Sequence, residues 1–300
     1  MKKFFSLILV FVLCLSISLP AFAMSDSADD LDYSEAYIYF SEQLAEKGIS
    51  ANTCLEDFIE GYEHTAGSSL PSYVTSLIEE EVAFASALEV TVTNNLQYAP
   101  ALPDEASQGS GIDPYSIGDS WYDNIGVSNP QLPQRASYNR YNILSTVQKG
   151  DIIHETTGGI AALTGHIAIV QGKYYDTNYG QYYIRTIEAV WDRVVYGVLD
   201  DTRYQNRGDE VYYVTSANAT QKARAVDFCI GQLGKPWSLE MPLLSECAYE
   251  STTENWYCSE LVWAAYYNQN INLHGLTIPR HIYTPSALAG SSMLTYRNVE

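Results

Sequence analysis

Helical periodicity is clearest near the C-terminal end of the chain, around the segment Trp256–Trp263. Four residues there follow the three- and four-residue spacing of one helix face: Cys258, Leu261, Val262 and Ala265. Asn255, three residues before Cys258, is the expected N-cap. The pattern predicts a helix that carries Cys258 in its first turn and packs its apolar face on a core.

The same helical period appears in the N-terminal part, over residues 24–95. Its apolar positions are Ala36, Phe40, Leu44, Leu55, Phe58, Ile59, Tyr73, Leu77, Ile78 and Val82. Pro71 marks a helix start, and acidic residues occupy the other faces. We expect a small helical region here, with a pro-segment or a cap over a substrate site as alternatives to a plain bundle. Residues 96–140 are rich in Pro, Gly, Ser, Asn and Asp without a period, which predicts a linker or a long loop.

From residue 141 onward the pattern changes to strands. A short strand is expected to end at His154, and His166 opens a second apolar run that ends at Val170. Residues 171–180 contain turn-forming residues, and residues 182–190 then alternate, with Thr186 and Glu188 on one face. A hairpin centred on Thr177 would place His166 directly opposite Glu188, with Cβ atoms about 5 Å apart.

These three positions can be combined into one site. A thiol in the first turn of a helix meets the positive end of the helix dipole and free backbone N–H groups, which favour the nucleophilic thiolate. A carboxylate beside an imidazole fixes its tautomer and supports its protonation. Cys258, His166 and Glu188 are therefore candidates for the nucleophile, base and orienting group of a cysteine hydrolase. Taken singly, each has a plainer interpretation: a buried structural thiol, a half-buried strand histidine and a solvent-facing carboxylate.

Other residues compete for these roles. His154, His274 and His281 are rival bases, although His154 should point away by strand alternation and the other two lie in expected loops. Tyr257 adjoins the nucleophile and either packs beside it or supports an oxyanion. The chain has no C-x-x-C or H-E-x-x-H motif, so we expect neither a metal nor a cofactor.

The first residues have the organisation of a secretory signal, Met1–Ala23. Lys2 and Lys3 precede the apolar run Phe4–Leu19, and Ala21-Phe22-Ala23 is a small-residue cleavage site. An uncleaved anchor is the alternative, but the run is short for a membrane span of about 20 residues. We expect a secreted protein without stable membrane insertion, either free or associated with the cell wall.

The net charge limits the kinds of molecule that the protein is expected to bind, and the cysteine content limits its possible disulfides. Removal of the two signal lysines from the 16 basic residues leaves 14 against 36 acidic ones, a net charge of −22. Such a charge argues against nucleic acid or anionic lipid as a partner. The mature cysteines would be Cys54, Cys229, Cys247 and Cys258. If Cys258 is a nucleophile, Cys229–Cys247 is the one pair that we consider for a disulfide.

Several segments together resemble the permuted papain-like hydrolases of the NlpC superfamily, most closely the YaeF/YiiX type. They are Lys149-Gly150-Asp151-Ile152-Ile153, Gly165-His166-Ile167-Ala168-Ile169-Val170, Ile187-Glu188-Ala189, Leu233-Gly234-Lys235-Pro236-Trp237 and Tyr257-Cys258-Ser259-Glu260-Leu261-Val262. In permuted members the histidine strand and the polar residue precede the cysteine helix, as they do here. The resemblance implies an α+β fold in which residues 141–300 form a circularly permuted papain-like domain, with an antiparallel sheet packed on the nucleophile helix. It also implies that Cys258 is the nucleophile, His166 the general base and acid, and Glu188 the orienting residue.

The resemblance further implies hydrolysis of an amide, often in cell-wall peptides. The leading hypothesis is an exported cysteine amidase or peptidase that acts on peptidoglycan stem peptides. One alternative is an acyl hydrolase or transferase that acts on a lipid or ester. Another is a catalytically idle domain that binds cell-wall fragments. The segment Gly158–Ala162, an insertion just before His166, departs from the family pattern and would reshape the groove wall.

Overall fold

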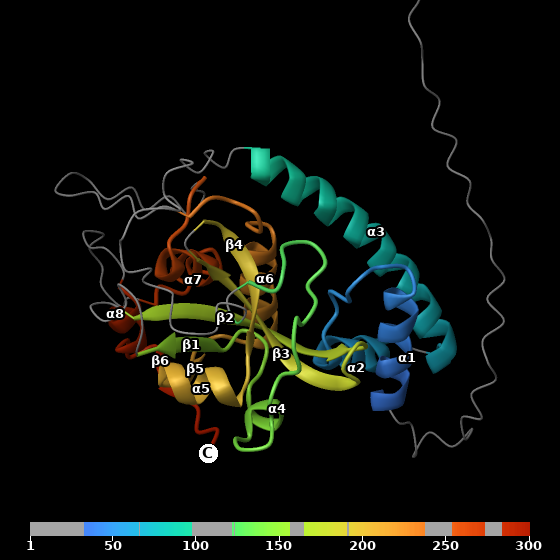
Figure 1. Ribbon diagram of the computed structural model, residues 1–300, viewed down its shortest axis with the longest axis horizontal. Coiled ribbons are helices and arrows are strands. Elements are labelled where there is room, and N and C mark those ends of the chain that lie inside the picture. The colour runs from blue at the N-terminus through green and yellow to red at the C-terminus, as the bar shows by residue number, and fades with distance from the viewer. Residues whose placement is uncertain are drawn as a thin grey trace, which may run out of the picture. The chain divides into compact units, whose positions relative to one another are not determined.

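The fold is α+β and is built on an open antiparallel sheet with the strand order β4-β3-β2-β1-β5-β6 (Figure 1). The strands are β1 Ile152–Glu155, β2 His166–Asp176, β3 Gln181–Ala189, β4 Val194–Leu199, β5 Asp209–Val214 and β6 Leu294–Tyr296. The structure is a computed structural model and describes residues 33–65, 67–97, 122, 124–156, 165–190, 192–237, 254–273 and 284–300.

Helices precede the strands along the chain and separate some of them from one another. They are α1 Tyr33–Ala45, α2 Leu55–His64, α3 Leu70–Gln97, α4 Ile143–Thr146, α5 Asp201–Arg207, α6 Ala219–Ile230, α7 Cys258–Tyr267 and α8 Pro285–Ala289. Helices α6 and α7 pack against each other and against β2 and β3, while α5 packs against β5. In the described part of the chain, no helix combines the length and the apolar character needed to cross a membrane.

The N-terminal helices pack on the same unit as the sheet. Residues Ser34–Glu300 form one compact unit, and α2 contacts β2 directly. The rings of Tyr37, Phe40 and Phe58 cluster with centroids 5.4 to 5.7 Å apart, and Tyr37 stacks on Tyr182 at 6.3 Å. The predicted signal segment and most of the predicted linker lie outside the described residues.

On one face of the sheet the buried side chains are apolar along part of the strands and polar or charged at one end. The apolar part includes Ile153, Ala168, Val170, Ile184, Leu199 and Val211 from the strands, with Ile143 of α4 and Tyr204 of α5. Side chains two residues apart on a strand share a face. The same face therefore continues into four buried polar residues at its end: Glu155, His166, Glu188 and Asp209.

The β2–β3 hairpin forms, but the predicted register is wrong. Strand β2 continues to Asp176, so that the turn covers only residues 177–180, and Ile169 pairs with Ile187. His166 thus does not lie directly opposite Glu188. The observed register, extended by one pair, places Glu188 opposite Ala168, which is two residues from His166 on the same face.

The position of the turn accounts for this difference, because its centre lies between Asn178 and Tyr179 and not at Thr177; an irregularity in β2 then moves the pairing back by one residue. The register of the hairpin shifts between Val170 and Gly172, and Gly172 has a φ of 149°. A Cβ atom on Gly172 would lie 2.6 Å from the Cβ of Cys54, the residue at the start of α2. The close approach of α2 therefore requires a glycine at the bulge, and the alternation of side chains alone does not reveal it.

Candidate active site

The helix that carries Cys258 begins later than the sequence predicts. Tyr257, not Asn255, is the N-cap, and Cys258 is the first helical residue of α7. Trp256 is still extended: it forms a parallel bridge with Trp237, and its N–H donates to the Pro236 carbonyl at 3.0 Å. Because of this pairing, the helix begins two residues later than it would with Asn255 as its N-cap. Cys258 remains in the first turn, where backbone N–H groups have no acceptor within the helix.

Helix α7 is buried on more than the one face that the sequence predicts. Leu261, Val262 and Ala265 are buried as expected, but Trp263 and Tyr266 are buried too. Contacts with α6 and α8, in addition to the sheet, cover these other faces. Cys258 itself is half-buried, so the helix presents its thiol at the edge of the packed core.

His166 lies between Cys258 and Glu188. Its Nε2 is 2.7 Å from Oε2 of Glu188, and its side chain also makes a hydrogen bond with Cys258. Burial of the ring opposes protonation, but the bonds to Cys258 and Glu188 prevail and raise the pKa of His166 well above its usual range. The structure thus brings Cys258, His166 and Glu188 together in the order nucleophile, base and carboxylate.

Glu188 is completely buried and is held on several sides. Thr186 donates its hydroxyl to Oε1 at 2.5 Å, and Arg203 of α5 donates to Oε1 at 3.0 Å and to Oε2 at 2.8 Å. Burial alone would raise the pKa of Glu188, but the Arg203 charge and the bonds to His166 and Arg203 lower it below its usual range. Glu188 is therefore an ionised carboxylate and not the solvent-facing residue of the plainer interpretation.

Gly197 on β4 makes room for this carboxylate. It pairs with Thr186 on β3. A Cβ atom at Gly197 would lie 1.9 Å from Oε1 of Glu188 and 2.5 Å from the Tyr122 carbonyl oxygen. The absence of a side chain at this position is what allows Glu188 to fold back over β4.

Of the rival bases, His154 does not join this site. His154 lies on β1 next to Glu155 and therefore points to the opposite face, where its Nδ1 is 3.2 Å from Oε2 of Glu210. His274, His281 and the insertion at Gly158–Ala162 lie outside the described residues. Tyr257 is half-buried, and its side chain does not cap α7, while its carbonyl accepts from the Leu261 N–H at 3.1 Å.

The other described cysteines are unlike Cys258. Cys54 and Cys229 are fully buried, and burial raises the pKa of each thiol. Cys247, the partner considered for Cys229, lies outside the described residues, so the Cys229–Cys247 pairing stays a prediction. Among the residues that the structure describes, no three His, Cys, Asp or Glu side chains are arranged to hold a metal ion.

Sequence reasoning missed two residues of the site, Arg203 and Gly197. Arg203 follows the helix cap Asp200 by three residues, but nothing in that spacing points to a residue on β3. Gly197 interrupts an apolar run on β4. A glycine inside a strand marks a close approach, which is the one signal that could have drawn attention to this position.

Comparison with known proteins adds no assignment: no protein-family model, curated protein or solved structure matches this chain. Function is therefore inferred from the geometry and chemistry of the site, together with the motifs of the sequence.

Thiol labelling can test whether His166 activates Cys258. We expect iodoacetamide at pH 6 to modify Cys258 faster than Cys54 and Cys229, because the thiolate is the reactive form and the other two thiols are buried. Exposure alone would also favour Cys258, so His166→Ala is the control. This variant should slow Cys258 labelling at pH 6 but not at pH 9, as read by peptide mass spectrometry. Equal rates for the wild type and His166→Ala at pH 6 would show that the thiol is not activated.

Proposed function

We propose that this chain is an exported cysteine hydrolase with a permuted papain-like domain, which cleaves an amide bond in peptidoglycan stem peptides. The observation that carries the proposal is the hydrogen-bonded series Cys258, His166 and Glu188. A nucleophile, a base within reach of it and a third group that orients the base form the recurring arrangement of covalent hydrolases.

The order of these residues along the chain supports the permuted form. His166 opens β2, Glu188 lies near the end of β3, and Cys258 comes last, at the start of α7. Helix α7 packs against both of those strands. An antiparallel sheet beside a helix with the nucleophile at its first residue agrees with the resemblance of the five motifs to this superfamily.

The geometry supports a two-step acyl transfer. His166 accepts the proton of the Cys258 thiol, and the resulting imidazolium is stabilised by the Glu188 carboxylate. The thiolate attacks the substrate carbonyl, and the first N–H groups of α7 are placed to stabilise the oxyanion. His166 then protonates the departing amine. In the second step His166 takes a proton from a water molecule as that water attacks the thioester carbonyl. The C–S bond breaks, the acid leaves, and the imidazolium returns its proton to the Cys258 thiolate.

The substrate class rests on the sequence. The motif resemblance points to amides of cell-wall peptides, and the predicted secretory signal would deliver the protein to them. The net charge of −20 for the whole chain disfavours strongly anionic polymers as substrates. A peptide amide is thus the bond that best fits both the site and the predicted location.

Mass spectrometry of purified cell-wall fragments can test this function. Incubation with the protein in heavy-oxygen water should yield shorter peptides, each with one heavy oxygen in its new carboxyl group, because water releases the acyl-enzyme. Cys258→Ala should yield none. Cys229→Ala, which removes a buried thiol from α6, is the matched control and should keep the activity.

Three results would contradict the proposal in different ways. Cleavage of a lipid ester or lipid amide, with intact peptides, would keep the thiol chemistry and replace the substrate. Peptide cleavage that persists in Cys258→Ala would remove the site itself. Binding of fragments without cleavage, together with an unreactive Cys258 thiol, would favour the idle binding domain.

A further inference from the structure

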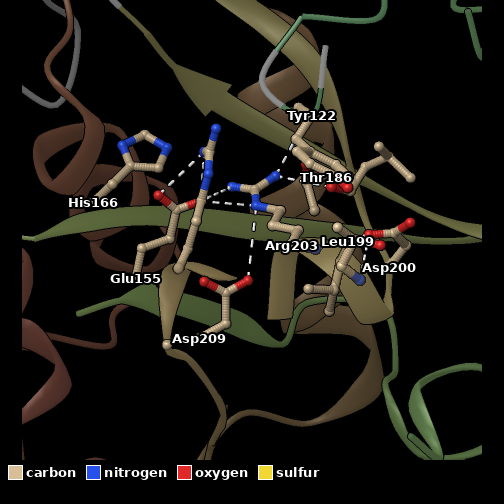
Figure 2. Close-up of polar contacts among 12 residues, drawn as sticks. Tyr122, Glu155, His166, Thr186, Leu199, Asp200, Arg203 and Asp209 are labelled. Atoms are coloured by element: carbon tan, nitrogen blue, oxygen red, sulfur yellow. Dashed lines mark hydrogen bonds and ion pairs between the residues drawn. The ribbon is translucent and has the colours of Figure 1, made fainter. Parts of the chain in front are cut away.

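Arg203 is a buried cation that joins two carboxylates behind His166. Its side chain is 0 % exposed. It donates two hydrogen bonds to Glu188, one to each oxygen, and on its other side its Nε donates to Oε1 of Glu155 at 2.8 Å. Figure 2 shows the guanidinium with Glu155 to one side of it and Asp209 below it, and with Tyr122 and Thr186 nearby.

Three further charged residues lie around Arg203: Arg207 and Glu155, which bond each other, and Asp209. Arg207, one helical turn later on α5, donates to both oxygens of Glu155 at 3.0 and 3.3 Å and shares that partner with Arg203. Burial would raise the pKa of Glu155, but Arg203, His166 and Arg207 lower it. Asp209 differs: burial and the neighbouring Glu155 raise its pKa well above the usual range, and neither of its oxygens has a hydrogen-bond partner. Asp209 thus belongs to the cluster without a hydrogen bond of its own, and its Oδ2 lies 3.8 Å from Nε of Arg203.

The guanidinium itself is fixed by its own short helix. The Asp200 carboxylate caps α5 and accepts from the backbone N–H groups of Thr202 and Arg203 at 3.0 and 2.9 Å. Gly208 ends the helix in the left-handed conformation, with a φ of 60°. Nη1 of Arg203 also donates to the Val198 carbonyl at 2.9 Å. Asp200 therefore fixes the backbone of Arg203, and the Val198 carbonyl helps to fix its guanidinium, independently of Glu188.

We propose that Arg203 is a positioning residue of the hydrolase site, which acts on His166 by holding Glu188 in place. The inference rests on the function proposed above and adds a fourth residue to it. A planar guanidinium can bond both oxygens of one carboxylate and still reach a second carboxylate through Nε, which a lysine ammonium cannot match.

The consequence for the reaction follows from burial. Without the Arg203 fork, Glu188 would be a buried carboxylate with only Thr186 and His166 as partners. A buried carboxyl group that loses its cation tends to protonate. A neutral Glu188 would support the imidazolium of His166 less well, and fewer Cys258 thiolates would exist near neutral pH.

The pH dependence of Cys258 alkylation can test this role without any substrate. Arg203→Lys should slow iodoacetamide alkylation at pH 6 by about tenfold, which corresponds to a shift of about one unit in the pH profile, with rates that converge at pH 9. Arg207→Lys is the matched control, because Arg207 lies on the same helix and donates to both oxygens of Glu155, the carboxylate that it shares with Arg203. Its profile should stay within about twofold of the wild type.

The outcomes separate the two proposals. If the wild type shows no reactivity at pH 6 above that of an ordinary thiol, the hydrolase proposal fails and this inference fails with it. If the wild type is reactive and folded Arg203→Lys keeps the same profile, only the positioning role is overturned, and a lower melting temperature in that variant would mark Arg203 as structural.

A second comparison covers the case in which Arg203→Lys does not fold. Glu188→Gln/Arg203→Met removes both charges of this ion pair, so neither residue is left as a buried charge without its partner. Because Arg203 acts only through Glu188, the double variant should have the same alkylation profile as Glu188→Gln alone. A further slowing in the double variant would overturn the proposal.

Discussion

Replacement of Cys258 or His166 with alanine is expected to lower kcat/KM on any cleaved substrate by at least about 10³-fold. Cys258→Ala removes the atom that forms the covalent intermediate. His166→Ala removes the group that takes the thiol proton and later protonates the leaving amine. Purified variants assayed on the same cell-wall peptide give the measurement.

The double variant provides the stricter comparison. Residues that act as one unit show non-additive losses, so Cys258→Ala/His166→Ala should be no slower than either single variant. Because Cys258 is half-buried at the start of α7, its truncation should leave the melting temperature close to that of the wild type. Losses that multiply in the double variant would mean that the two residues act in separate steps or sites.

The elements of the site could be predicted because their patterns are local. The spacing of Cys258, Leu261, Val262 and Ala265 predicts α7, and alternation after His166 and before Glu188 predicts two strands of a hairpin. The exact pairing and the first helical residue were wrong. The pairing depends on the position of the turn at residues 177–180 and on the bulge at Gly172, which α2 contacts. The first helical residue depends on the bridge between Trp237 and Trp256.

The environment of Glu188 could not be predicted from the same patterns. Alternation assigns a residue to a face of a strand but does not say what covers that face. Here α5 covers it, and this helix follows β4, so Arg203 reaches Glu188 from a different element of the fold. The gap left by Gly197 and the burial of two arginines beside two carboxylates are likewise properties of the assembled sheet.

The burial of Glu188 leads to a large expected effect on stability. Glu188→Gln should lower the free energy of unfolding by about 3–5 kcal/mol at pH 7, the usual cost of removing one partner of a buried ion pair. The amide oxygen could still accept one bond, but its NH₂ group would face the donors of Arg203. The variant should also lose about 10²-fold or more in kcat/KM, because the imidazolium of His166 loses its carboxylate.

The pH dependence of this stability difference follows from the lowered pKa of Glu188. Above about pH 4.3, the ordinary value for a glutamate, both the folded and the unfolded wild type carry the charge, and the folded state gains the full stabilisation. As the pH falls below that value, the unfolded chain takes up a proton that the folded site disfavours. Urea unfolding should therefore show a smaller difference between the wild type and Glu188→Gln at pH 3 than at pH 7.

Glu210→Gln is the control for this prediction, because Glu210 also pairs with a histidine, His154, but its side chain is 42 % exposed. An exposed pair contributes little, so this variant should change the stability by less than about 1 kcal/mol and leave the activity unchanged. If Glu188→Gln were as mild as Glu210→Gln at pH 7, Glu188 would not be a buried, ionised partner of Arg203. The orienting role would then belong to another group beside His166, or to none.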